Sequence, residues 1–270
     1  MNLEELKTVG FASHNSIINA DCLEAMKYIQ DKSVDMILCD LPYGWNGTTA
    51  CKWDVVIPFK PLWEQYKRII KDRGAIVLFG SEPFSSHLRL SNLEMYKYDW
   101  YWRKRRPSGF TNAKLKPLKD IETISVFSNG TTANGSKNNM IYNPQGLIDC
   151  DINWSRPNIY FGIDHNINPT RENSKLNRKI NKCGYPRQIL DYSNPNKKNI
   201  HPTQKPVALF EYLIKTYTNE GDLILDNCAG SGTTAIACIN TKRDFILMEK
   251  EEKYYNIINE RISNYYENII

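Results

Sequence analysis

The 270-residue sequence has no apolar run of eighteen residues or more, and its first residues lack the basic and then apolar pattern of a signal peptide. We therefore expect a cytoplasmic protein without a membrane span. None of its seven cysteines form a C-x-x-C pair, and its four histidines are scattered along the chain. This pattern argues against a metal centre, and it predicts free, mostly buried thiols rather than disulfides.

Positive charge is concentrated in the middle third of the chain, although the net charge is only +5. Residues 103–200 carry 17 Lys and Arg against 7 Asp and Glu, a balance of +10, so the two flanking parts together carry −5. A polyanion-binding surface explains this asymmetry, since each cation set against a phosphate releases condensed counterions. A solvated basic loop explains the charge equally well.

Strand and helix patterns alternate at both ends of the chain, as in βαβ units, and predict an α/β fold. In the N-terminal part, an apolar strand at 34–39 is followed by an amphipathic helix that begins near residue 58, with Gly74 as its stop, and by a second strand at 75–80. Further strands are expected at 96–102 and 122–128. From Asn129 to Asn199 periodicity is lost and Asn, Gly, Ser and Lys accumulate, which predicts a loop-rich inserted lobe.

A glycine turn stands between a strand and a helix in the segment Asp226-Asn227-Cys228-Ala229-Gly230-Ser231-Gly232. Glycines there let the backbone turn tightly and approach a ligand, and the following helix start offers free N–H groups. Glu249 ends the next strand, where an acid accepts hydrogen bonds from ribose hydroxyls in nucleotide sites. Position 235 is Ala, so the third glycine of the dinucleotide fingerprint is missing. The turn therefore favours a nucleoside without phosphates over NAD.

The tetrapeptide Asp40-Leu41-Pro42-Tyr43 follows directly on the apolar strand at 34–39. Ligands of open α/β sheets bind at this carboxyl edge, so a carboxylate and an aromatic ring are expected to converge there on a planar group. A helix-capping Asp before a proline is the alternative interpretation of an isolated Asp-x-Pro.

Together, the segments "DNCAGSGTT", "DLPYG" and "HPTQKP" resemble the S-adenosylmethionine-dependent DNA amino-methyltransferases in their β-class order. The resemblance implies a doubly wound, Rossmann-like methyltransferase fold with a mostly parallel seven-stranded sheet whose seventh strand is antiparallel. It divides the chain into a catalytic half at 1–127, a target-recognition region at 128–199 and a cofactor-binding half at 200–270.

The resemblance also assigns roles around the cofactor S-adenosyl-L-methionine. Asp21 and the backbone of Cys22 match the position that contacts the adenine ring, and Glu249 matches the acid that holds the ribose. The turn around the methionine part comprises Asp226, Cys228, Gly230, Gly232 and Thr233. Thr203 and Lys205 are expected at the cofactor carboxylate, for which a lysine cation is suited.

The tetrapeptide is implied to act on a base that has left the duplex. Asp40 and the carbonyl of Leu41 accept both hydrogens of the exocyclic amine, so that its nitrogen exposes its lone pair, and Tyr43 stacks on the base. The family's usual residue at position 41 is Pro; only the carbonyl is needed there, so Leu serves. Asp in first position favours adenine N6, with cytosine N4 as the alternative.

The basic run from Arg103 to Lys116 suits contact with DNA phosphates, and a solvated turn is its alternative. The expected contacts are Arg103, Lys104, Arg105, Arg106, Phe110 and Lys114. Residues 44–54, with Trp45 and Trp53, have the composition of a mobile loop that closes over the flipped base, although both rings also suit packing of that loop. Double-stranded DNA is the expected partner. A silent DNA-binding subunit and an RNA or protein methyltransferase are the rival functions, of which the basic middle region disfavours the protein methyltransferase. A homodimer and a cognate restriction endonuclease stay open.

Overall fold

The computed structural model describes residues 1–9, 15–44, 54–154, 178–194 and 204–267. It divides into two compact units, one formed by Met1–Asn143 with Gln188–Ile270 and the other by Pro144–Arg187. The predicted target-recognition region at 128–199 has wider bounds than the second unit, since residues 128–143 and 188–194 belong to the first unit. Within the described residues, no helix is long and apolar enough to cross a membrane.

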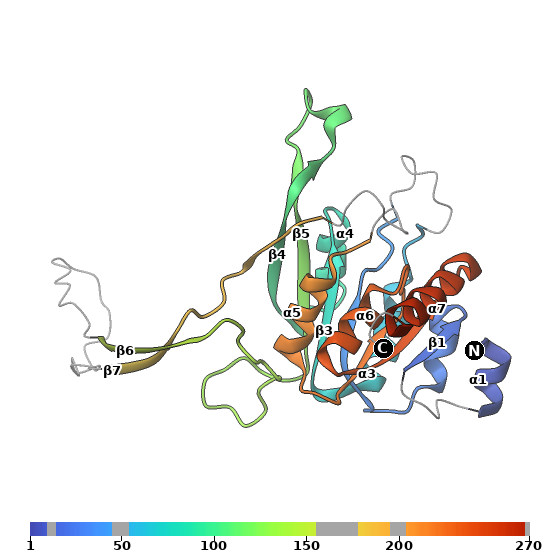
Figure 1. The fold of residues 1–270 in the computed structure, drawn as a ribbon, viewed down its shortest axis with the longest axis horizontal. Coiled ribbons are helices and arrows are strands. Elements are labelled where there is room, and N and C mark those ends of the chain that lie inside the picture. The colour runs from blue at the N-terminus through green and yellow to red at the C-terminus, as the bar shows by residue number, and fades with distance from the viewer. Residues whose placement is uncertain (10–14, 45–53, 155–177, 195–203, 268–270) are drawn as a thin grey trace. The chain divides into compact units, whose positions relative to one another are not determined.

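The first unit is built on an eight-stranded sheet in the order β1-β10-β9-β2-β3-β5-β4-β8 (Figure 1). Among its strands only β5 runs antiparallel to its neighbours. The strands are β1 (Ser16–Asn19), β2 (Val34–Cys39), β3 (Ile70–Gly80), β4 (Tyr96–Ser108), β5 (Lys119–Phe127), β8 (Ile189–Tyr192), β9 (Leu223–Asp226) and β10 (Asp244–Glu249).

The expected fold class is confirmed, but the expected count of seven strands is wrong for the described residues. The additional strand is β8, which returns from the second unit and pairs in parallel with β4 from Tyr101↔Ile189 to Lys104↔Tyr192. An edge strand leaves a row of backbone groups unpaired, and β8 satisfies those of β4.

Helices cover both faces of the sheet, so the fold is doubly wound (Figure 1). They are α1 (Leu3–Val9), α2 (Cys22–Ala25), η1 (Met26–Tyr28), α3 (Phe59–Ile69), α4 (Phe84–Leu90), η2 (Phe110–Asn112), α5 (Val207–Tyr217), α6 (Thr233–Thr241) and α7 (Glu252–Glu267). Successive side chains of β2 point to opposite faces of the sheet and so belong to two separate apolar clusters. Ile37 and Cys39 pack in the cluster with α3, whereas Met36 and Leu38 pack in the cluster with α5 and α6. A strand buried on both faces explains its nearly continuous apolar run, which Asp35 interrupts.

Gly74 does not end a helix, contrary to expectation. Helix α3 ends at Ile69, and Gly74 lies inside β3 beside β2. A Cβ there would stand 2.6 Å from the carbonyl oxygen of Asp35, so the close approach of the two strands requires glycine.

Strand β4 extends beyond the predicted residues 96–102 into the basic run, because β5 continues to pair with it as far as Ser108↔Lys119. The two strands form a long hairpin that continues past the ends of the neighbouring strands, with η2 at its tip (Figure 1). The basic run is therefore strand as far as Ser108, and its remaining residues, 109–116, lie exposed at the tip of the hairpin.

The second unit contains a hairpin of β6 (Ile148–Trp154) and β7 (Arg178–Cys183). A disulfide joins Cys150 to Cys183, whose Cα atoms lie 6.0 Å apart, so the prediction that all cysteines are free is wrong. The two are 33 residues apart in sequence, and only the strand pairing brings them together. The free cysteines among the described residues are Cys22, Cys39, Cys228 and Cys238.

Candidate active site

Four strands of the sheet deliver acidic residues to one edge. Asp40 follows β2, Asp226 ends β9, Glu249 ends β10, and Asp21 follows β1. These strands are mutually parallel, so their carboxyl ends meet. The chain leaves β2 through α3 on one face and β9 through α6 on the other, which makes the β2–β9 boundary a topological switch point. A cavity of about 920 Å³ opens there, lined by all four acids.

Two glycines shape the turn between β9 and α6. Gly230 has φ +54°, and its N–H donates to Glu249 Oε2 at 2.8 Å. Gly232 has φ +75° and packs behind the cavity, where a Cβ would meet Ile258 at 3.0 Å. The N–H of Glu251 donates to the other oxygen of Glu249 at 2.9 Å. The turn therefore fixes the Glu249 carboxylate, which two backbone amides orient at the cavity wall.

Asp226 and Asp21 hold the backbone on either side of this turn. Asp226 accepts hydrogen bonds from the Cys228 N–H at 3.1 Å and from the Thr234 hydroxyl, and burial raises its pKa to about 7. Asp21 caps α2 by accepting from the Leu23 N–H at 3.0 Å and also pairs with the Lys250 ammonium at 3.2 Å. Both acids line the cavity while they stabilise its frame.

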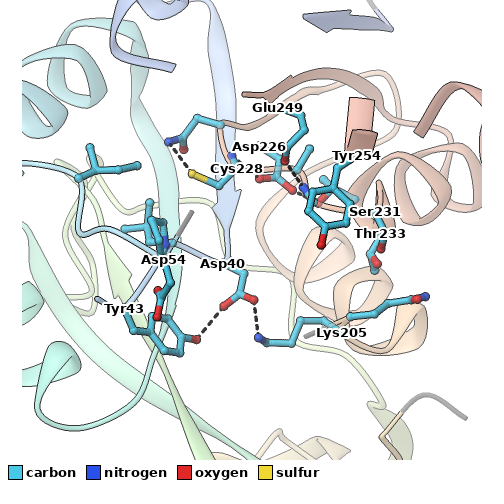
Figure 2. A pocket seen from close by; sticks show the side chains of 18 of the residues that line it. Asp40, Tyr43, Asp54, Lys205, Asp226, Cys228, Ser231, Thr233, Glu249 and Tyr254 are labelled. Atoms are coloured by element: carbon cyan, nitrogen blue, oxygen red, sulfur yellow. Dashed lines mark hydrogen bonds and ion pairs between the residues drawn. The ribbon is translucent and has the colours of Figure 1, made fainter. Parts of the chain in front are cut away.

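Asp40 is the centre of a second cluster at the other end of the cavity (Figure 2). Its Oδ1 accepts from the Tyr43 hydroxyl at 2.7 Å, and its Oδ2 accepts from the Lys205 ammonium. Burial raises the pKa of Asp40 even though Lys205 opposes it. Burial also raises the pKa of Tyr43, so its hydroxyl stays protonated and donates. One face of the Tyr43 ring stacks on Phe84, with 5.1 Å between ring centroids.

Glu122 joins this cluster from β5 and was not expected from the sequence. Its Oε2 lies 3.4 Å from the Lys205 ammonium, and Lys104 of β4 also forms an ion pair with Glu122. Burial acts to raise the pKa of Glu122, but Lys205 and Lys104 outweigh it and hold that pKa below its usual range. For Lys205, burial acts to lower the pKa, but Asp40 and Glu122 keep it above its usual range. The cluster therefore contains two carboxylates and two ammonium groups.

Most predicted site residues line this cavity. They are Asp21, Cys22, Asp40, Leu41, Pro42, Tyr43, Lys205, Asp226, Cys228, Gly230, Thr233 and Glu249, together with Lys104 from the basic run. Gly232 lies behind the wall, and Thr203 and the loop at 45–53 lie outside the described residues. The ammonium of Lys205 contacts Asp40 and Glu122, and its expected contact with the cofactor carboxylate stays a prediction.

The other basic-run residues lie on the exposed face of the β4–β5 hairpin. Phe110 is 67% exposed, and the remaining exposed members are Arg103, Arg105, Arg106 and Lys114. Arg103 forms a bidentate pair with Asp191, with Nε and Nη2 at 2.5 and 2.8 Å from the carboxylate oxygens. Lys104 differs, since strand alternation directs its ammonium to Glu122 rather than to solvent.

Several cavity residues were not predicted as site residues: Tyr254, Trp102, Asn194 and Glu122, and also Ser231 and Gln204, which lie within the segments "DNCAGSGTT" and "HPTQKP". Ser231 lies within the glycine turn, and its position between Gly230 and Gly232 was a sequence signal for a place at the site. Tyr254 and Trp102 come from a helix and a strand whose aromatic residues give no signal of facing a ligand.

An open, doubly wound sheet with a cavity at its switch point defines the chain as a Rossmann-like α/β protein. A family profile described as a DNA methylase matches residues 34–260. The Type II methyltransferase M.HpaI of Haemophilus parainfluenzae is 26% identical over 260 residues, which span 92% of this chain and 74% of that protein. The chain belongs to the N6/N4 DNA methylase family, and S-adenosylmethionine is its cofactor.

Solved structures agree with this assignment. The M1.HpyAVI–SAM complex superposes with a TM-score of 0.57 at 26% identity, covering 91% of this chain and 98% of that one. PvuII DNA methyltransferase, described as cytosine-N4-specific, gives a TM-score of 0.63 over 95% of this chain and 93% of its own. At 15% identity, that second likeness shows the fold alone.

The chemistry of the cavity fits S-adenosylmethionine. Its volume lies within the roughly 300–1,000 Å³ that ligand pockets have. The Glu249 carboxylate is oriented to accept from hydroxyl groups, and carboxylates of Asp226 and Asp40 suit a sulfonium cation. Apolar walls from Leu23 and Ile57 complete the enclosure.

Proposed function

We propose that this protein methylates the N6 amine of adenine at a specific site in double-stranded DNA. The observation that carries the proposal is the Asp40 cluster, which shares one cavity with the Gly230 turn and Glu249. The proposal is supported because a carboxylate suited to accept from an amine lines the same cavity as a turn suited to a nucleoside cofactor. Asp in first position of the tetrapeptide supports adenine over cytosine.

In the proposed mechanism, the chain's own groups orient an exocyclic amine. Asp40 accepts one hydrogen of the amine and the backbone carbonyl of Leu41 accepts the other, which turns the nitrogen lone pair away from the base ring. Tyr43 presents the ring face opposite Phe84 for stacking on the base. S-adenosylmethionine, when bound, supplies an electrophilic methyl group on a cationic sulfur.

The cofactor residues act before transfer, by fixing position. Glu249 holds the ribose hydroxyls, Asp21 with Cys22 contacts the adenine ring, and the turn at Asp226, Cys228 and Gly230 receives the methionine part, with Thr233 at the start of α6. Alignment of the amine with the methyl group then lowers the barrier mainly through proximity and orientation. After transfer, the nitrogen loses a proton, and the proposed acceptor is the Asp40 carboxylate that holds the amine.

The exposed side of the hairpin is proposed to bind the DNA backbone. Arg105, Arg106 and Lys114 are exposed cations, and Phe110 at the tip presents an exposed ring. Phosphate contacts fix the register of the protein on DNA but do not read the sequence. Base recognition is proposed for residues 128–199, of which 155–177 and 195–199 lie outside the described part of the chain.

Labelled methyl transfer tests the proposal directly. Duplex DNA of varied sequence is incubated with the protein and methyl-labelled S-adenosylmethionine, then hydrolysed to nucleosides. We expect the label in N6-methyladenine. Label in N4-methylcytosine would show that the target base is cytosine and not adenine. Label in structured RNA but not in DNA would contradict the proposal that DNA is the substrate.

The relative M.HpaI is a Type II methyltransferase, and we propose that this chain also protects a short DNA sequence against a cognate endonuclease. Sequencing of modified bases in DNA from cells that express the protein identifies the sequence. Digestion of that DNA with endonucleases specific for it tests protection. A homodimer is a further prediction, which light scattering at micromolar concentration tests.

A further inference from the structure

Both carboxylate oxygens of Asp40 have protein partners. Tyr43 donates to Oδ1 at 2.7 Å, and the Lys205 ammonium donates to Oδ2. The target amine of the proposed mechanism donates to this same carboxylate, and the Lys205 ammonium takes up one of the positions that such a donor can occupy. For the amine to bind in that place, Lys205 has to give up Oδ2.

Glu122 offers the displaced ammonium a prepared position. Its Oε2 is buried and makes no hydrogen bond among the described residues, yet lies 3.4 Å from Lys205 Nζ. A charge-assisted hydrogen bond has a length of about 2.7–2.9 Å, so a shift of under about 1 Å by the ammonium completes the bond. The Lys205 ammonium is also 5.4 Å from the Phe79 ring centroid, a contact that supports it on this path.

The charge of the reacting nitrogen gives this shift a function. Nitrogen gains positive charge as it takes the methyl group, and an ammonium held on Asp40 repels that charge. Movement of the Lys205 ammonium toward Glu122 therefore weakens its pairing with Asp40, so that more of the Asp40 charge acts on the developing cation.

We propose that Glu122 is a positioning residue for methyl transfer, which takes the Lys205 ammonium from Asp40 when the target amine enters. This inference rests on the proposed function of Asp40. Lys104 anchors Glu122 from the other side through its ion pair and lies 5.3 Å from the Trp102 ring centroid. Glu122 thus stays in place while the Lys205 ammonium moves.

The charged and titratable groups that face this exchange come from four elements. They are Asp40 and Tyr43 after β2, Lys104 from β4, Lys119 and Glu122 from β5, and Lys205 before α5. The negative charge of Glu122 raises the pKa of Asp40. Its removal leaves Asp40 as the single carboxylate beside Lys205, which lowers the pKa of Asp40 and strengthens the pair that the amine must break.

The test is Glu122→Gln under single-turnover conditions with saturating DNA and cofactor. We expect a methyl-transfer rate constant at least tenfold below wild type, with cofactor affinity within about twofold. We also expect the acid limb of the pH–rate profile to move to lower pH. A residue with only a structural role would weaken cofactor binding and leave the acid limb in place, and that result would overturn the proposal.

Two further variants secure the interpretation. Asp120→Asn removes one charge from the same strand at an exposed position, and it should match wild type. Glu122→Asp keeps the charge and should retain at least a third of the wild-type rate constant. A folded Glu122→Asp variant tenfold or more slower than wild type contradicts the proposal, and this comparison does not depend on whether Glu122→Gln folds. If the wild type is active and Glu122→Gln transfers the methyl group at the wild-type rate, this inference alone is refuted. If the wild type methylates no DNA, the proposed function is refuted.

Discussion

Asp40→Asn removes the negative charge of the proposed amine acceptor while it keeps the size of the side chain and one acceptor oxygen. The lost hydrogen bond to a charged group amounts to about 1.5–3 kcal/mol, and the lost field on a nitrogen about 4 Å away to about 4 kcal/mol. These contributions overlap, so we expect the barrier to rise by about 4 kcal/mol in total. Each 1.36 kcal/mol is a factor of ten, which gives about a thousandfold slower transfer.

The structure also indicates that this variant folds. Lys205 keeps Glu122 as a partner, 3.4 Å away, so no buried ammonium is left without a carboxylate. Transfer is measured as single-turnover incorporation of labelled methyl, and cofactor affinity is measured by calorimetry with S-adenosylhomocysteine. Glu94→Gln, whose side chain is 85% exposed, is the matched control. A rate constant for Asp40→Asn within about threefold of wild type, at normal cofactor affinity, would refute the role of Asp40.

Three further changes test cofactor affinity, the rate of methyl transfer and the pH dependence of stability. Glu249→Gln should weaken cofactor affinity by about tenfold or more, because a charged acceptor for the ribose is lost, and calorimetry should show this while the saturated rate constant stays within about threefold. Tyr43→Phe removes only the hydroxyl that donates to Asp40 at 2.7 Å, so we expect about a tenfold slower single turnover, and an unchanged rate would contradict that contact. Burial raises the pKa of Asp226 to about 7, so its native carboxyl binds a proton more tightly than the unfolded one, and stability is lost as pH rises from 3.8 to about 7. Asp226→Asn should therefore reduce the fall in unfolding free energy between pH 5 and pH 8 by about 3 kcal/mol in urea titrations, and an equal fall in both proteins would argue against it.

The parts of the site that the sequence predicts lie at the ends of parallel strands. Asp40, Asp226 and Glu249 each close an apolar run, and parallel strands must bring such ends to one edge. Glu122 has no such signal, because it lies within an antiparallel strand whose first residues are polar. Its position at the cavity depends on the register Trp102↔Glu122, which is set by the long hairpin.

Long-range pairing accounts for the other differences. The strand β8 has only four residues, and nothing in Ile189–Tyr192 indicates that it pairs with β4. The disulfide between Cys150 and Cys183 likewise depends on the β6–β7 pairing. Gly74 was expected to stop a helix because it follows an amphipathic run. Its actual role depends on the close approach of the β2 backbone, which the residues next to Gly74 in sequence do not reveal.

The sequence and the structure give Lys104 different partners. The basic run predicts a contact with a DNA phosphate, whereas in the structure the Lys104 ammonium pairs with Glu122. Each phosphate contact contributes about 0.9 to the slope of log affinity against log salt. Arg105 is exposed on the same strand, so Arg105→Met should reduce that slope by about one for binding to duplex DNA, whereas Lys104→Met should leave it unchanged. The same loss of slope in both variants would place Lys104 on the DNA backbone. Because alternate residues of one strand face opposite sides, β4 can bind DNA through Arg105 while it holds Glu122 through Lys104.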